Sequence, residues 1–251
     1  MTFSILTAAY NNAQYLNDWC SSIMSQSYRP LEVVFVNDAS TDRTKQMIEG
    51  IRARFVEAGI YFYPITNKKR LYCAAAYAEA LRESTGYYMG VVDADDMLSD
   101  PEAIQRVVDA YRKHSAVGWI YTQFNICHPA NMRVMKKGFC RAPTEGQSLL
   151  DMGLRGKHYY SHFRTFSRRI NNLDSILQNG LRAAVDKYMG YRLEELGNGM
   201  FLDRVCYHYR NGSFKGITHT EKTREIWKQV IDEAVERRKD GRIIYPIISA
   251  Q

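Results

Sequence analysis

The 251-residue sequence lacks several features that would define its class at once. No apolar run approaches the roughly 20 residues that a membrane-spanning helix needs. The opening stretch, MTFSILTAAYNN, has neither the basic segment nor the small-residue cleavage site of a signal peptide, and it is typical of a first strand. The five cysteines are scattered and form no CxxC pair, which argues against structural disulfides and zinc. These absences predict a cytoplasmic protein.

The sequence also lacks the common nucleotide-binding motifs. Neither the GxGxxG of a dinucleotide site nor the GxxxxGK[ST] of a P-loop is present, and there are no internal repeats or low-complexity linkers. Hydrophobic residues make up 45% of the chain and charged residues 24%, as in an ordinary globular protein. The formal net charge of +7 predicts attraction to anions, without choosing among nucleotide phosphates, an anionic membrane surface and nucleic acid.

The most informative stretch is GYYMGVVDADDML, residues 86–98. A short apolar run typical of a buried strand leads directly into Asp93, Asp95 and Asp96. Asp93 and Asp95 project to the same side of an extended backbone, where their charges repel unless a cation lies between them. Hard oxygen ligands of this kind favour Mg²⁺ or Mn²⁺. The alternative is an acidic loop that caps the next helix, although Asp100 can do that alone.

Strands and helices are predicted to alternate through the first half of the chain. The expected strands cover 3–8, 31–36, 60–65 and 87–92, and the expected helices cover 15–25, 47–55, 73–84 and 101–113. This alternation predicts right-handed crossovers and a parallel sheet with helices on both faces. Ligands bind at the carboxyl ends of the strands in such sheets.

Polar turns follow three of these strands, at 37–42 (NDASTD), 67–70 (NKKR) and 93–96 (DADD). With Tyr10 and Asn11 after the first strand, they supply an aromatic ring, amides, carboxylates and cations at one edge of the sheet. That set suits a nucleoside diphosphate, because the ring can stack on the base while the cations and a metal bind the phosphates.

The second half is less regular. A strand is expected at 117–122, loops with a short strand near 132–135 over 125–157, a helix at 172–196, a strand at 200–207 and an amphipathic helix at 220–239. The last helix is basic but also carries many acids, which favours at most peripheral contact with a membrane.

The motifs SILTAAYNN, VVFVNDASTDRT, STGYYMGVVDADDML, AVDKYMGYRLEELG and VCYHYR occur in this order between about residues 3 and 210. Together they resemble the family 2 glycosyltransferases of the GT-A fold. The resemblance implies an α/β fold with a Rossmann-like, mostly parallel sheet, flanking helices and a C-terminal helical extension. It divides the chain into a domain at 1–215, with a nucleotide-sugar half (1–115) and an acceptor and catalytic half (116–215), and a helix and tail at 216–251 packed on it.

Members of this family transfer a sugar from a nucleotide diphosphate sugar to an acceptor hydroxyl, usually with inversion and with Mn²⁺ or Mg²⁺. The resemblance implies a UDP-sugar donor here, and a saccharide, lipid-linked or small-molecule acceptor rather than nucleic acid. It assigns the nucleotide site to Thr7, Ala9, Tyr10, Asn12, Asp38, Arg70 and Asp93. In this assignment Tyr10 stacks on the base, Asp38 contacts the base edge, and Arg70 lies near the phosphates.

The same resemblance implies that Asp95 ligates the metal, that His208 adds a further metal contact and that Asp186 is the general base. The sequence departs from the family at three places, where Ala9 replaces a Thr, Val185 replaces a Glu, and residues 76–80 replace an Ala-Arg-Asn-x-Gly segment. The last departure is why the phosphate contact is assigned to Arg70.

A basic and aromatic segment is expected on the acceptor side, and its candidate residues are Lys157, His158, Tyr159 and His162. It could bind a sugar or an anionic acceptor, or be a packed strand with a polar face. Two other functions stay open, a nucleotidyltransferase and a non-catalytic protein that binds nucleotide sugars or anions. Nucleotidyl transfer needs a glycine-rich basic loop after the first strand, and TAAYNN supplies none. The observation that separates the non-catalytic hypothesis from the transferase is whether Asp95 and Asp186 face one another across a cleft, because the transferase mechanism fails if they do not.

Overall fold

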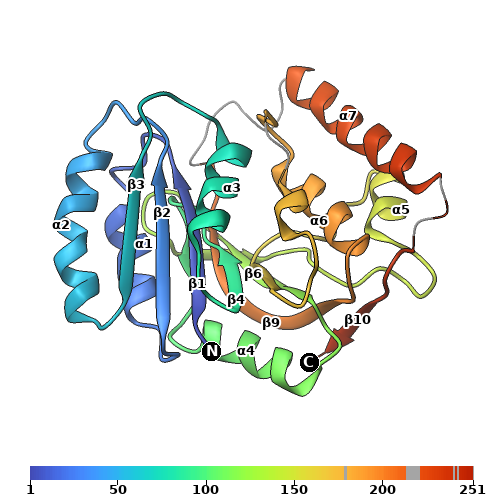
Figure 1. Ribbon diagram of the computed structural model, residues 1–251, viewed down its shortest axis with the longest axis horizontal. Helices are drawn as coiled ribbons and strands as arrows, with labels where there is room; N and C mark the ends of the chain where they lie inside the picture. Colours follow the sequence, from blue (N-terminus) through green and yellow to red (C-terminus); the bar gives the residue numbers. More distant parts are fainter. Residues whose placement is uncertain (178–179, 213–220, 240, 242, 251) are drawn as a thin grey trace.

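The computed structural model describes residues 1–177, 180–212, 221–239, 241 and 243–250 (Figure 1). Its strands are β1 (Phe3–Ala9), β2 (Leu31–Asn37), β3 (Tyr61–Thr66), β4 (Tyr88–Val91), β5 (Met97–Leu98), β6 (Trp119–Cys127), β7 (Val134–Lys137), β8 (Arg164–Ser167), β9 (Gly199–Arg210) and β10 (Ile247–Ala250). Its helices are α1 (Leu16–Met24), α2 (Thr44–Glu57), α3 (Cys73–Glu83), α4 (Ala103–Lys113), α5 (Leu149–Leu154), α6 (Val185–Glu194) and α7 (Glu221–Arg238), with a 3₁₀ turn, η1, at Leu173–Ile176.

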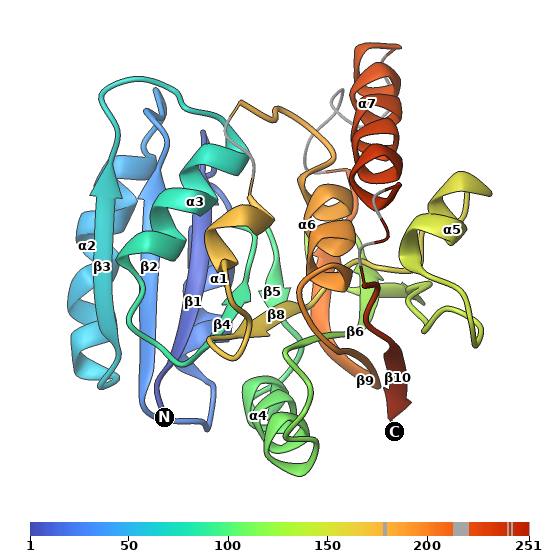
Figure 2. The same cartoon turned by 45° about the vertical axis from the view of Figure 1, so that its right-hand side comes forward.

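The described strands form one sheet in the order β10-β9-β6-β8-β4-β1-β2-β3, with β5 paired to β9 and β7 paired to β6. The β4-β1-β2-β3 block is parallel, and so is the β6-β9-β10 block. Between them, β8 runs antiparallel to both β4 and β6. The predicted α/β fold of GT-A type, with a mostly parallel sheet and flanking helices, is therefore confirmed (Figures 1 and 2).

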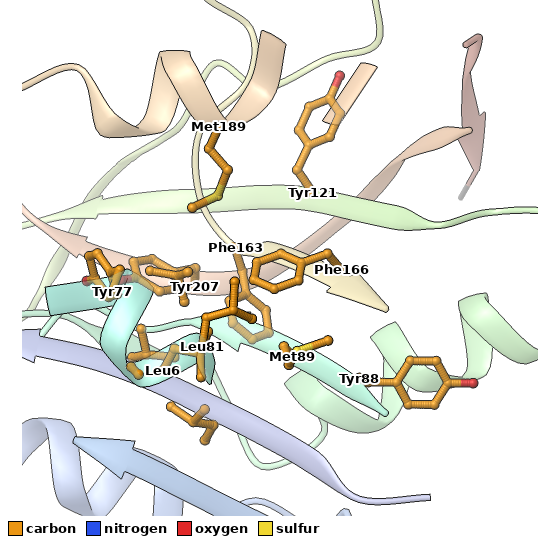
Figure 3. Packing of buried hydrophobic residues seen from close by; sticks show 14 of the residues in the cluster. Leu6, Tyr77, Leu81, Tyr88, Met89, Tyr121, Phe163, Phe166, Met189 and Tyr207 are labelled. Atoms are coloured by element: carbon orange, nitrogen blue, oxygen red, sulfur yellow. The ribbon is translucent and has the colours of Figure 1, made fainter. Parts of the chain in front are cut away.

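Strands β1, β2 and β4 are buried on both faces, as expected for parallel strands covered by helices. Figure 3 shows the core where β4 and β8 meet, with the ring of Phe163 between Met89 and Tyr207. Gly90 makes this packing possible, because a Cβ there would lie 2.6 Å from the Phe163 ring. The close approach places His162 and Arg164, which flank Phe163, beside the end of β4.

The helix predicted at 172–196 is interrupted. Only η1 and α6 are helical in the described part of that range, and the residues between them include Gly180 at φ +86° and Ala184 at φ +57°. Left-handed residues cannot continue a right-handed helix, so a new helix starts after Ala184. As a result Asp186 lies in the first turn of α6 rather than in the middle of a long helix.

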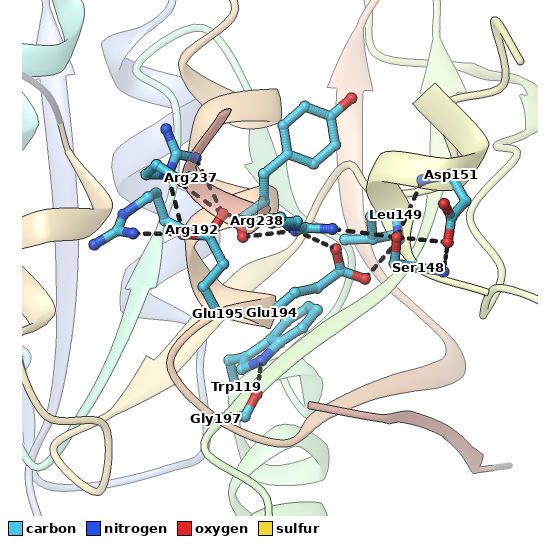
Figure 4. A network of polar contacts seen from close by, with 11 residues as sticks. Trp119, Ser148, Leu149, Asp151, Arg192, Glu194, Glu195, Gly197, Arg237 and Arg238 are labelled. Atoms are coloured by element: carbon cyan, nitrogen blue, oxygen red, sulfur yellow. Dashed lines mark hydrogen bonds and ion pairs between the residues drawn. The ribbon is translucent and has the colours of Figure 1, made fainter. Parts of the chain in front are cut away.

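Helix α7 is attached to α5 and α6 by a buried network of charges (Figure 4). The carboxylate of Glu195 has no exposed surface and accepts hydrogen bonds from Arg192, Arg237 and Arg238. Glu194 pairs with Arg238 at 3.0 Å, and burial raises the pKa of this carboxyl to about 7. The network fixes α7 over α6, so that α7 forms one wall of the cavity described below.

The predicted boundary between residues 215 and 216 lies outside the described residues. Within the described part of the chain, no helix is both long and apolar enough to cross a membrane.

Candidate active site

A cavity of about 750 Å³ opens at the carboxyl ends of β1, β2 and β4. On the opposite side it is bounded by the first turn of α6 and by α7. The residues that line it from the sheet side include Ala9, Tyr10, Asn12, Asp38, Arg70, Tyr72, Asp93, Asp95 and Asp96. Those from the second half of the chain include His162, Arg164, Arg182, Asp186, Tyr209 and Trp227. The cavity therefore joins the two halves of the domain.

At one end of the cavity, the Arg70 guanidinium lies over the Tyr10 ring, 3.6 Å from its centroid. It also lies 4.9 Å from the centroid of Tyr72. Asn12 fixes the loop beneath, since its side-chain oxygen accepts a 2.9 Å hydrogen bond from the Tyr10 N–H. Thr7 does not line the cavity: its buried hydroxyl donates to the Val92 carbonyl and joins β1 to β4.

Asp38, at the end of β2, is buried and holds the loop that precedes α3. Its carboxylate accepts hydrogen bonds from the backbone N–H groups of Leu71 and Tyr72, at 2.7 and 2.8 Å. It also accepts one from the Asn67 amide at 3.2 Å. The capping of α2 is left to Asp42, which accepts from the Thr44 N–H. Asp38 thus shapes the end of the cavity that holds Tyr10.

The three acids after β4 have different surroundings. Asp93 accepts hydrogen bonds from the Tyr77 hydroxyl and from Arg164, the latter at 2.8 Å. Burial is the largest single influence and would raise the pKa of Asp93, but the opposing influences, led by the charge of Arg164 and including the hydrogen bonds from Tyr77 and Arg164, together outweigh it and the pKa is lowered. Asp96 accepts from the Tyr207 hydroxyl and the Arg210 N–H, and burial followed by the charges of Asp95 and Asp93 raises its pKa well above the usual value.

These groups fit a divalent cation. One ligand atom from each of Asp93, Asp96 and His162 lies within 4.8 Å of the others, and Asp95 lines the cavity beside them. Among the described atoms, the buried Nδ1 of His162 has no hydrogen-bond partner. Burial, followed by the charge of Arg164, lowers the pKa of His162 to about 4 and keeps its ring neutral. Carboxylates and a neutral imidazole suit Mn²⁺ or Mg²⁺.

Asp186 lines the same cavity as Asp95, from the first turn of α6. Its neighbour Lys187 is not among the residues that line the cavity. The Lys187 ammonium lies 3.1 Å from the centroid of the Trp227 ring and 3.2 Å from His158 Nε2. Burial lowers the pKa of Lys187 to about 8, against the opposing charge of Asp186. Lys187 thereby holds Trp227 of α7 against the cavity.

His208 does not lie where the sequence prediction placed it. Because side chains alternate along β9, Tyr207 and Tyr209 face the acids and His208 points away from them. The His208 ring instead lies 3.3 Å from the Asn125 amide of β6. The imidazole that the structure brings to the acids is His162, whose ring stacks on those of Tyr207 and Tyr209.

The predicted acceptor segment is split by the fold. His162 is its one candidate residue that lines the cavity, within the part of the chain that the structure describes. His158 contacts Lys187, Tyr159 packs under the Arg141 guanidinium at 3.7 Å, and the side chain of Lys157 is exposed. No helix or strand runs through residues 157–163, and the chain bends at His162 and Phe163 before it enters β8.

Sequence reasoning missed several residues that line the cavity, among them Tyr77, Arg164, Arg182 and Trp227. The only signal for Arg164 was the basic and aromatic segment before it. Trp227 lies on the apolar face of the amphipathic helix predicted at 220–239, and no local pattern distinguishes a packed face from a cavity wall.

A mostly parallel sheet has clustered acids at its strand ends, and the second half of the chain adds an acid to the same cavity. This arrangement is typical of glycosyltransferases of the GT-A type. Comparison with known proteins agrees. The model of the family described as glycosyl transferase family 2 matches residues 4–176, and the chain belongs to this family. Asp186 and α7 lie beyond the matched residues.

A chondroitin synthase of Escherichia coli is 27% identical over 241 residues, which are 93% of this chain and 32% of that protein. The chain thus spans about a third of the length of this relative. Among solved structures, S. aureus TarS in complex with UDP-GlcNAc has a TM-score of 0.73 at 18% identity, covering 94% of this chain and 66% of that one. The mannosyltransferase PcManGT from Pyrobaculum calidifontis, in complex with GDP-Man and Mn²⁺, has a TM-score of 0.57 at 17% identity, covering 81% and 55%.

Proposed function

We propose that the protein is a metal-dependent, inverting glycosyltransferase that moves a sugar from a nucleotide diphosphate sugar to an acceptor hydroxyl. The main support is that Asp95 and Asp186, from separate halves of the chain, line one cavity. A non-catalytic binding protein would not need a second acid opposite the first. Asp95, the proposed metal ligand, and Asp186, the proposed base, therefore share the cleft that the transferase hypothesis requires.

The donor is proposed to bind with its base near Tyr10 and its diphosphate near Arg70 and Asp95. TarS, with UDP-GlcNAc, and PcManGT, with GDP-Man, support a nucleotide-sugar ligand for this fold. We favour a UDP-sugar. The Arg70 guanidinium already lies on one face of the Tyr10 ring, so the base is proposed to contact the part of the ring that Arg70 leaves free.

We propose Asp95 as a ligand of Mn²⁺ or Mg²⁺, with His162 and the neighbouring acids around it. When bound, the ion supplies positive charge that stabilises the departing diphosphate. Arg164 neutralises Asp93 and Tyr77 donates to it, so these residues hold the acidic turn in place. His208 is not proposed as a ligand, because it points toward Asn125.

Asp186 is proposed to act as the general base. It accepts the proton of the acceptor hydroxyl while that oxygen bonds to C1 of the sugar, and the bond from C1 to the diphosphate oxygen breaks on the opposite face. Configuration at C1 is inverted by this displacement.

The acceptor is proposed to be a saccharide, a lipid-linked molecule or a small molecule that carries a hydroxyl group. We keep the cytoplasm as the proposed location, which the free state of all five cysteines supports.

Calorimetric titration of UDP and GDP, with and without Mn²⁺, tests the donor site. The wild-type protein is expected to bind one of them more tightly with Mn²⁺. Asp95→Asn is expected to weaken that binding at least about tenfold and to leave metal-free binding unchanged, since a tenfold loss corresponds to about 1.4 kcal/mol. Asp109→Asn, at an exposed position on α4, is the matched control and should bind like the wild type. A folded wild-type protein that binds neither nucleotide would overturn the proposal.

A further inference from the structure

Two arginines at the mouth of the cavity are held on the same aromatic ring. The Arg182 guanidinium lies 4.2 Å from the centroid of Tyr72, and that of Arg70 lies 4.9 Å from it and 3.6 Å from the centroid of Tyr10. Arg70 comes from the loop before α3, and Arg182 comes from the loop that leads into α6. Tyr10, Arg70, Tyr72 and Arg182 therefore form a continuous column that bridges the two halves of the domain.

The charges of these arginines are not neutralised by a neighbouring carboxylate. Three arginines line the cavity in the described part of the chain, and Arg164 is paired with Asp93 at 2.8 Å. Neither Arg70 nor Arg182 has an ion pair with a described residue, and both are exposed to solvent. Stacking on a ring restrains the guanidinium but leaves its N–H donors available, because the contact is made through the flat face. The column is thus a pre-arranged site for an anion.

We infer, on the basis of the proposed function, that Arg182 and Arg70 together bind the diphosphate of the donor. Each arginine would approach the diphosphate from one side of the cleft. A diphosphate offers several charged oxygens, which two guanidinium groups can contact with paired hydrogen bonds. Arg182 precedes Asp186 by four residues, across the left-handed Ala184. Binding of the diphosphate to Arg182 therefore restrains the loop that leads into α6, whose first turn carries the proposed base, whereas a nucleoside without phosphates does not.

Titrations of the nucleoside, its monophosphate and its diphosphate separate a phosphate contact from a general effect on folding. With Arg182→Ala, the affinity for UDP (or for GDP, if that is the nucleotide bound) is expected to fall about tenfold. The affinity for uridine or guanosine is expected to stay within about twofold of the wild type, with the monophosphate in between. Arg182→Lys should recover part of the loss, since it keeps the charge but not the paired donors.

Arg52→Ala, at an exposed position on α2, is the matched control and should bind the diphosphate like the wild type. Unchanged diphosphate affinity in Arg182→Ala would overturn the role of Arg182 while leaving the proposed function intact, and so would an equal loss for nucleoside and diphosphate. Absence of diphosphate binding by the wild-type protein would instead overturn the proposed function, and this inference with it.

Discussion

Asp186→Asn is expected to lower the rate of sugar transfer by about 100- to 10,000-fold, which is the usual contribution of a positioned general base. Asparagine keeps the size of the side chain and its place in the first turn of α6 but cannot accept the proton of the acceptor hydroxyl. Nucleoside diphosphate affinity in the presence of Mn²⁺ should change little, because no contact with the nucleotide is assigned to Asp186. Release of nucleoside diphosphate from a panel of UDP- and GDP-sugars measures the rate.

Asp174→Asn provides a matched control, since this exposed acid lies in η1, away from the residues that line the cavity. Its transfer rate should equal that of the wild type. An Asp186→Asn variant that retains more than about a tenth of the wild-type rate would exclude Asp186 as the general base, even if donor binding were intact.

Arg164→Met is expected to destabilise the protein by about 3 kcal/mol, the lower end of the usual cost of removing one partner of a buried ion pair, because the Asp93 side chain keeps 26% of its surface exposed. The Arg164 side chain is 6% exposed and donates at 2.8 Å to Asp93, which would be left charged and without its cation. The loss should appear as a lower midpoint in urea unfolding followed by circular dichroism.

Arg112→Ala removes an arginine from an exposed pair with Asp109, in which both side chains are more than half exposed. This control should cost less than about 1 kcal/mol, because solvent screens surface pairs. If Arg164→Met were no more costly than Arg112→Ala, Asp93 would not depend on Arg164, and the acidic turn would be held in place by other contacts.

The donor half was predictable because its signals are local. The runs at 31–36 and 60–65 correspond to β2 and β3 within one residue at each end. Strand β2 is buried along its whole length, as expected of a central parallel strand, whereas β3 lies at the edge of the sheet and buries only Phe62. The acids after β4 and the turn after β2 meet at one edge of the sheet because parallel strands place their carboxyl ends together. The alternation of strands and helices along the chain was enough to predict this.

The acceptor half was less predictable because it depends on contacts between distant parts of the chain. Strand β8 lies between β4 and β6 and is antiparallel to both. It has only four residues, and their pattern does not predict this position in the sheet. The sequence prediction gave the metal contact to His208 and placed His162 on the acceptor side. The register of β9 and the packing of Phe163 against Gly90 instead bring His162 to the acids. The break before α6 depends on the left-handed Ala184, a conformation that alanine seldom adopts.

Crystals of the protein grown with UDP and Mn²⁺ would test the central claim most directly, through the anomalous scattering of manganese. The account predicts a manganese peak at coordination distance from the Asp95 carboxylate, with the diphosphate between that ion and the Tyr10–Arg70 end of the cavity. Asp186 should face the same space from α6. A nucleotide bound elsewhere, or a manganese peak that does not contact Asp95, would contradict it.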